Sequence, residues 1–144
     1  MKDCNYALQK AYNIELANIA FESVAVPAYF RSLPDNVNPS NYIIFDHVTN
    51  ADSSTMNSAD TNSSMRVTIH TFDLKYNTGK AAGDIGNQVL QIIYPNSQAV
   101  LDLSADNLQM VSTELVSDIP QDYNQASRAY LDRILIFRHK IYHR

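Results

Sequence analysis

The sequence is poor in the residues that supply cross-links, tight turns and charge. Among its 144 residues there are one cysteine, Cys4, no tryptophan and three glycines, and 18% of the residues are charged. A single cysteine excludes an internal disulfide. No apolar run approaches the roughly 18 residues of a membrane-spanning helix, and residues 1–6 lack the apolar core of a signal peptide. We therefore expect a protein made in the cytoplasm, with no membrane contact.

Motifs for catalysis and cofactor binding are also missing. No serine lies in a G-x-S-x-G elbow, and the Gly79–Lys80 pair lacks the upstream glycine of a phosphate loop. Asp46 and His47 are neighbours in a predicted strand, where adjacent side chains point to opposite faces, so they are poorly placed for acid–base chemistry. Asp73 and Asp118 lie near predicted turns, as surface acids do. Cys4 is expected to be an inert thiol, because a nucleophile needs a specific electropositive setting.

The histidines show no spacing typical of a zinc site; they are His47, His70, His139 and His143. His139 and His143 would share a face of a helix, but their segment has the pattern of a strand, where they lie about 13 Å apart. The sequence therefore predicts no catalytic residue, metal or cofactor. A small enzyme stays a third hypothesis, which a pocket lined by Asp46 or His70 would support.

The residues that are present favour one globular domain covering residues 1–144. Apolar residues make up 45% of the chain, enough for a core at this length. The formal net charge of -4 disfavours attraction of the whole molecule to DNA. Asparagine occurs 14 times and serine 13 times, so these residues supply much of the turn chemistry. Nine tyrosines suit a protein that makes subunit contacts.

Two segments have helical periodicity. Residues 3–18 form the first, with Asp3 as its cap. Residues 80–94 form the second, in which apolar side chains recur on one face until Pro95 ends it. Gly83 and Gly86 weaken this helix and are expected to mark close packing.

Five segments have the pattern of strands, at residues 24–29, 42–48, 65–74, 108–116 and 129–142, with a short strand or turn at 100–103. Pro27 places the first of them at a sheet edge. Val67, Ile69 and Thr71 are expected on one face. Residues 118–128 are predicted to be a polar connection. The order predicts an α+β fold, a mostly antiparallel sheet with an N-terminal helix and one central helix packed on it.

Residues 49–64 are predicted to be a long polar loop, because their one large apolar side chain is that of Met56. Loops of this length in compact domains are usually functional or disordered. We expect the loop to be held by a neighbouring subunit. Its candidate contact residues are Thr49, Ser53, Met56, Asn57 and Asn62.

The C-terminal segment is basic, because residues 133–144 hold four arginines and lysines, two histidines and no acid. Three interpretations stay open: a solvated strand end, a surface for an acidic partner subunit, and a surface for a nucleic-acid backbone. The candidate interface residues here are Arg138, His139, Lys140, Tyr142 and Arg144.

The segment V-A-V-P-A-Y-F-R-S-L-P, followed by N-Y-I-I-F-D-H-V, resembles the tail terminator (tail-completion) proteins of tailed bacteriophages. In that family an N-terminal helix leads to an apolar strand with Pro and Tyr, a proline-containing turn and a strand that opens with Tyr. R-V-T-I-H-T-F, A-A-G-D-I-G-N-Q-V-L-Q-I-I and R-I-L-I-F-R-H-K-I-Y are similar to the family's later elements. The resemblance covers most of the chain through loose patterns of apolar and turn residues.

The resemblance implies a structural virion protein without catalytic residues. Its subunits form a homo-oligomeric ring at the head–tail junction, which caps the tail tube and contacts other neck, tail or portal proteins. DNA could pass through the lumen of such a ring without specific binding. The alternative from a different class is a small α+β binding module for nucleic acid or peptide.

Overall fold

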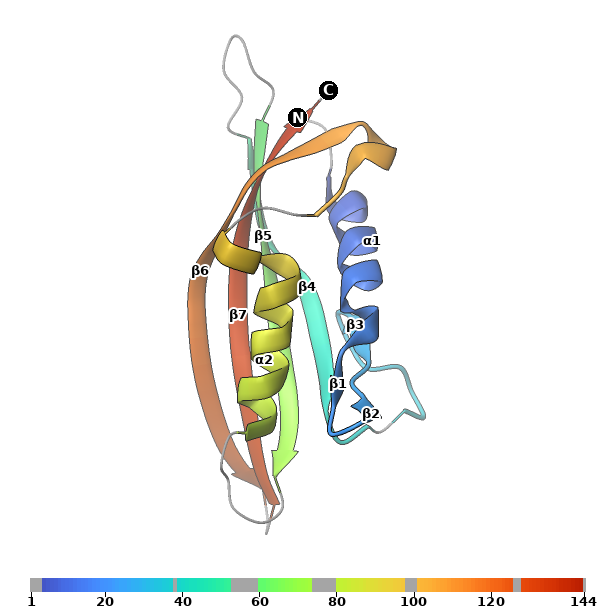
Figure 1. The fold of residues 1–144 in the computed structure, drawn as a ribbon, viewed down its shortest axis with the longest axis vertical. Helices are drawn as coiled ribbons and strands as arrows, with labels where there is room; N and C mark the ends of the chain where they lie inside the picture. Colours follow the sequence, from blue (N-terminus) through green and yellow to red (C-terminus); the bar gives the residue numbers. More distant parts are fainter. Residues whose placement is uncertain are drawn as a thin grey trace.

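In the computed structural model, which describes residues 4–37, 39–52, 60–73, 80–97, 101–125 and 128–143, a long twisted sheet carries two α-helices on one face (Figure 1). The strand order of this five-stranded sheet is β3-β4-β5-β7-β6. Its strands are β3 (Ala28–Phe30), β4 (Tyr42–Asp52), β5 (Asp60–Asp73), β6 (Leu108–Gln125) and β7 (Arg128–His143). All neighbours are antiparallel except β3 and β4. The predicted α+β class is therefore confirmed.

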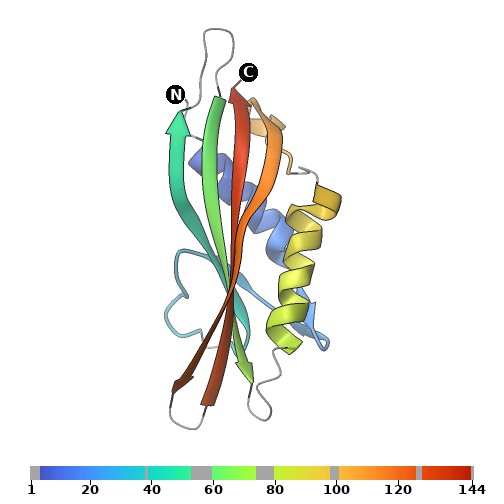
Figure 2. The same cartoon turned by 90° about the vertical axis from the view of Figure 1, so that its left-hand side faces the viewer.

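Both predicted helices are present. Helix α1 spans Asn5–Glu15 and continues into a 3-10 turn at Leu16–Asn18. Helix α2 spans Lys80–Ile93 and is followed by a 3-10 turn that opens with Pro95. The predicted cap Asp3 lies outside the described residues, and Cys4 occupies the N-cap position. Helix α1 contacts β3 and β4 and reaches β7 through Tyr12, whereas α2 contacts β5 and β7, so both helices cover the same inner face (Figure 2).

The core lies between this inner face and the helices. Residues alternate along β5, and Val67, Ile69 and Thr71 share the buried face as predicted. Tyr12, Phe45 and Phe137 are the largest side chains that are fully buried. Burying one large apolar side chain contributes about 1.5–3 kcal/mol. One continuous cluster joins both helices to β4, β5 and β7, so the helices hold the sheet's inner face away from water.

The predicted strand at residues 24–29 is in fact two strands. Val24–Ala25 forms β2, which pairs with β1 (Ala20–Phe21) in a separate two-stranded sheet. The chain breaks its pairing at Val26 and Pro27, and β3 then joins the main sheet at its edge. The predicted edge position is thus correct, and the proline marks the point where the chain changes sheet.

The predicted polar loop at residues 49–64 is wrong over its described part. Strand β4 continues to Asp52 and β5 begins at Asp60, and the two stay paired up to Asp52 and Thr61. The polar inner-face side chains have partners: Thr61 Oγ1 lies 2.6 Å from His143 Nε2, and the Ser63 hydroxyl donates to Asn50 Oδ1 at 2.5 Å. These hydrogen bonds satisfy the buried hydroxyls of Thr61 and Ser63. Polar residues whose own preference is for loops are therefore stable in this part of the sheet.

The predicted polar connection at residues 118–128 is also wrong for the residues that the structure describes, 118–125 and 128. Strand β6 runs without interruption to Gln125 and pairs with β7 along that length. It tolerates Pro120 because it lies at a sheet edge, where a missing N–H costs least. Of the short strand or turn predicted at residues 100–103, Leu101–Leu103 is irregular and leads into a 3-10 turn at Ser104–Asp106, and Val100 lies outside the described part.

The two glycines of α2 differ in their surroundings. A Cβ placed on Gly86 would lie 2.3 Å from Arg133 Nη1 and 2.8 Å from Arg133 Cδ, whereas a Cβ on Gly83 would meet nothing within 4 Å. Close packing is therefore confirmed for Gly86, and the Gly83 position leaves room for a methyl group.

This contrast gives a matched pair of substitutions. Gly83→Ala should stabilise the protein by about 1 kcal/mol, because alanine is the better helix former. Gly86→Ala should destabilise it, because overpacking typically costs about 1–3 kcal/mol and exceeds that gain. Urea unfolding of the two variants measures both effects. Equal stabilisation by the two substitutions would show that Arg133 moves away freely.

Candidate assembly surface

The outer face of the sheet, which the helices leave uncovered, gathers several predicted interface residues. Cross-strand register places Thr49, Asn62, Arg138, Lys140 and Tyr142 on this face, in three successive rows near one end of the sheet. Their side chains are exposed or half-buried. Thr49 and Tyr142 are far apart in the sequence. The fold therefore brings both predicted groups, from the polar segment and from the basic C-terminus, onto one surface.

Ion pairs link the strands across this face. Arg66 donates to both carboxylate oxygens of Asp46, and Arg138 Nη1 lies 2.7 Å from Glu114 Oε1. Lys140 Nζ lies 3.9 Å from Asp60 Oδ2. Because Arg138 and Lys140 both face acids of their own sheet, the basic bias of the C-terminal sequence is largely neutralised in the fold. Exposed pairs of this kind contribute little to stability.

A polar hollow of about 290 Å³ opens between these charged strands, lined by Asn62, Ser112, Glu114, Arg138 and Lys140. The middle of the outer face mixes apolar and charged side chains. Ile44, Ile134 and Ile136 are half-buried there, and Ile119 of β6 is 48% exposed. The Arg66–Asp46 pair lies in the same row as Ile136. Mixed surfaces of this kind are common in protein–protein contacts, which are about as apolar as the rest of a protein surface.

At the other end of the outer face, His70 lies between an acid and an aromatic ring. Its Nδ1 is 3.1 Å from Asp132 Oδ2, and its ring stacks on Tyr42 with centroids 4.7 Å apart. Asp46 and His70 were the residues whose pocket would support an enzyme. They lie in different rows of an open face, and neither lines a described pocket.

The free edge of β6 is interrupted by two bulges. Register shifts occur between Met110 and Ser112 and between Leu115 and Ser117, so Val111 and Val116 are the extra residues. Both valines are nearly half exposed. Bulges at a sheet edge re-aim side chains and limit uncontrolled strand pairing. This edge therefore presents two apolar side chains to the surroundings, beside the exposed carboxylate of Glu114.

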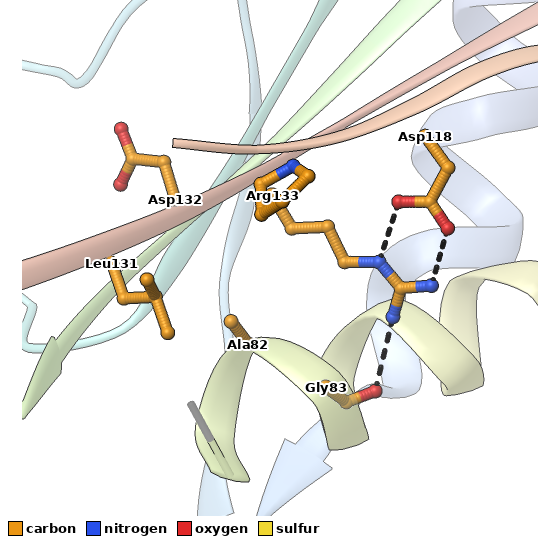
Figure 3. A pocket seen from close by; sticks show the side chains of 7 residues that line it. Ala82, Gly83, Asp118, Leu131, Asp132 and Arg133 are labelled. Atoms are coloured by element: carbon orange, nitrogen blue, oxygen red, sulfur yellow. Dashed lines mark hydrogen bonds and ion pairs between the residues drawn. The ribbon is translucent and has the colours of Figure 1, made fainter. Parts of the chain in front are cut away.

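Arg133 fastens the sheet to helix α2 on the inner face (Figure 3). Its guanidinium forms two hydrogen bonds with Asp118 of β6, at 2.8 and 2.6 Å, and donates to the Gly83 carbonyl at 3.3 Å. The hydrogen bond to Arg133 is the main cause of a lowered pKa for Asp118, and it likewise raises the pKa of Arg133. A hollow of about 350 Å³ lies beside this pair. The guanidinium of Arg133 already bonds Asp118 and the Gly83 carbonyl, so we interpret this arrangement as a contact that stabilises the fold.

His139 is not an interface residue, contrary to the prediction. Its side chain is fully buried on the inner face, where Nε2 lies 2.5 Å from the Tyr12 hydroxyl and Nδ1 lies 2.9 Å from Thr113 Oγ1. Adjacent residues of a strand point to opposite faces, so the exposed positions of Arg138 and Lys140 require this burial. Burial lowers the pKa of His139 to about 3 and raises the pKa of Tyr12, so both groups are neutral at pH 7.

Four other predicted interface residues lie outside the described residues: Ser53, Met56, Asn57 and Arg144. Within the described ranges, no group of three or more His, Cys, Asp or Glu side chains could hold a metal ion. Neither described helix is long and apolar enough to cross a bilayer. The features that sequence reasoning missed are the two bulges of β6, which leave no signal in composition.

Comparison with known proteins gives a match at the level of fold. No protein-family model matches the chain, and no curated protein sequence matches it. Among solved structures, a chain of the "Virion of native gene transfer agent (GTA) particle" superposes with a TM-score of 0.71. The two chains share 18% sequence identity, and the match covers 99% of each. The two proteins therefore share one fold over their whole compared lengths.

The buried histidine gives stability a pH dependence with a definite sign. A histidine in an unfolded chain has a pKa near 6.5, whereas burial lowers the pKa of His139 in the fold to about 3. The stability that the fold gains from a neutral His139 is fully present above about pH 6.5. As the pH falls from 6.5 towards 3, the unfolded state binds a proton that the folded state does not, and the free energy of unfolding decreases by about 1.4 kcal/mol per pH unit. Urea unfolding of wild type and His139→Gln between pH 7.5 and 4 should show a shallower slope for the variant. Other acids titrate alike in both proteins, so equal slopes would contradict the assignment.

Proposed function

We propose that this chain is a structural virion protein, a ring-forming subunit of the neck or tail terminator that joins the head or portal to the tail of a phage-like particle. The observation that carries this proposal is the fold match to a chain of a gene transfer agent virion over 99% of both chains. The resemblance of the sequence to tail terminators supports the same role independently. The protein would then act by contact and carry out no chemical reaction.

The surfaces of the subunit suit such a role. A ring needs two different patches per subunit, which meet head to tail and close when the rotation divides a full turn. The sheet offers a partly apolar outer face and two different edges, β3 and β6. A formal net charge of -4 would keep free subunits apart before assembly. Portal, tail and neck proteins are the further partners that the role requires, with DNA passing through the lumen.

The contact residues that we propose for subunits or neck partners are the outer-face set and the segment between β4 and β5. Thr49, Asn62, Arg138, Lys140 and Tyr142 form the first group, and Ser53, Met56 and Asn57 belong to the second. Nucleic-acid binding receives less support, because Arg138 and Lys140 both face acidic side chains of the same sheet. Arg144 is kept as a candidate on its position in the sequence alone.

Native mass spectrometry tests the proposed assembly. The protein, alone or mixed with tail tubes or portal complexes, should form a closed oligomer of one fixed copy number. Electron microscopy of the mixtures should show a ring at one end of each tube. An unrelated α+β protein of similar mass serves as the control for unspecific attachment. A strict monomer in every mixture would contradict the proposal.

The segment between β4 and β5 gives a second test. Replacing residues 53–59 by Asn-Gly leaves a short turn that is compatible with a hairpin. Because Asp52 and Thr61 are already paired, the free energy of unfolding of the variant should lie within about 1 kcal/mol of the wild-type value. Its assembly, measured by native mass spectrometry, should be weaker. Met56→Ser, which keeps the length, separates the effect of the apolar side chain, and unchanged assembly of both variants would remove this segment from the interface.

A further inference from the structure

The exposed apolar side chains divide between β6 and a second group of elements. In the described part of the chain, the large hydrophobic side chains that are more than a third exposed are Tyr6, Ile14, Val24, Val37, Val48, Val111, Val116 and Ile119. Three of them lie on β6, and the other five lie on α1, β2, β4 and the connection before β4. The intervening elements β5, β7 and α2 carry none among their described residues. Such a division is not expected of scattered surface residues, which need no explanation singly.

The first group centres on the middle of β6. Val116 is 45% exposed and Ile119 is 48% exposed. Val116 is the extra residue of a bulge, and Ile119 lies on the outer face opposite Ile134. Strand β6 also contains three acids and no lysine or arginine. We call Val116 and Ile119 the β6 flank.

The second group lies at the other side of the molecule. Ile14 in the last turn of α1 is 70% exposed, and Val24 of β2 is 66% exposed. Helix α1 crosses the inner face of the sheet, where it contacts β3 and β4 and where its Tyr12 bonds His139 of β7. In Figure 1, α1 and β2 lie on one side of the molecule and the middle of β6 lies on the other. We call Ile14 and Val24 the α1 flank.

We propose that the β6 flank of one subunit packs on the α1 flank of a second copy of this chain. This pairing rests on the proposed ring and identifies the two surfaces that close it. Apolar side chains in both flanks would leave water together, which is the main favourable term in association. The free edge of β6 around Val116 and Ile119 would add further contact area to this interface. The contact joins two different patches, so it is head to tail and propagates from copy to copy.

A second copy is the occupant that the chain itself supplies for both flanks. One partner of another kind, docked on one flank, would leave the flank at the other side of the molecule exposed. A contact of the β6 flank with itself would leave the α1 flank exposed. Pairing the two flanks covers both groups at once, with every subunit making the same two contacts.

The test uses two variants that each destroy one flank. The β6 variant is Val116→Lys with Ile119→Lys, and the α1 variant is Ile14→Lys with Val24→Lys. Each should be a monomer by native mass spectrometry, because losing an apolar anchor weakens a contact by about tenfold or more. An equimolar mixture should form a dimer and nothing larger, because one intact β6 flank meets one intact α1 flank. The milder pair Val116→Thr with Ile119→Thr should weaken assembly in the same direction without adding charge.

Gln91→Lys on the exposed side of α2 is the control for added charge and should assemble like wild type. Circular dichroism and urea unfolding establish that each variant folds. Two outcomes would overturn this pairing but leave the proposed ring intact. In the first, the wild type and both flank variants form rings; in the second, the wild type forms rings and the mixture of the variants stays monomeric. Dimers of either variant alone also overturn it, because they indicate a contact of like surfaces. A wild-type chain that stays monomeric with every neck and tail component overturns both proposals.

Discussion

The fold depends on the pairing of β5 with β7, which are neighbours in the sheet although they are far apart in the chain. Their register is unbroken from Asp60 and Tyr142 to Asp73 and Ala129. Because side chains alternate along both strands, this single register decides which residues face the helices and which face outward. A slip by one position would bury Arg138 and expose His139. The position of the core and that of the proposed contact surface therefore follow from the same ladder.

The inner face also carries polar groups that specify how the helices sit. The Tyr12 hydroxyl and the Thr113 hydroxyl bond the two ring nitrogens of His139, so α1, β6 and β7 meet at one fully hydrogen-bonded point. Arg133 fixes α2 in the same manner through Asp118 and the Gly83 carbonyl. Buried polar groups with complete partners favour one arrangement over others, because any shift leaves a group unpaired. Each helix is thus held by polar contacts in addition to apolar packing.

Much of the fold could be predicted from the sequence, because α1, α2 and most strands have strong apolar periodicity. The parts that could not be predicted are polar strands. Thr61 and Ser63 have no apolar pattern, and they lie in a strand because Asn50 and His143 bond their hydroxyls. His143 is 82 positions from Thr61, and Asn50 lies on the neighbouring strand 13 positions from Ser63, so local composition does not reveal either partner. The candidate surface was predicted in part for a related reason: Arg138 and Lys140 are exposed, whereas His139 between them is buried, as strand alternation requires. The β6 flank was missed, since it depends on a bulge and on an edge position.

The order of the strands has a consequence for biosynthesis. Strand β7 follows β6 in the chain, yet it lies between β5 and β6 in the finished sheet. The hydrogen bond between Tyr12 and His139 joins residues 127 positions apart, so the core closes only after β7 has been synthesised. A polypeptide that stops before β7 lacks the strand next to the edge and exposes apolar surface, which favours aggregation. Folding of this sheet is therefore completed after the synthesis of β7 and not strand by strand as the chain emerges.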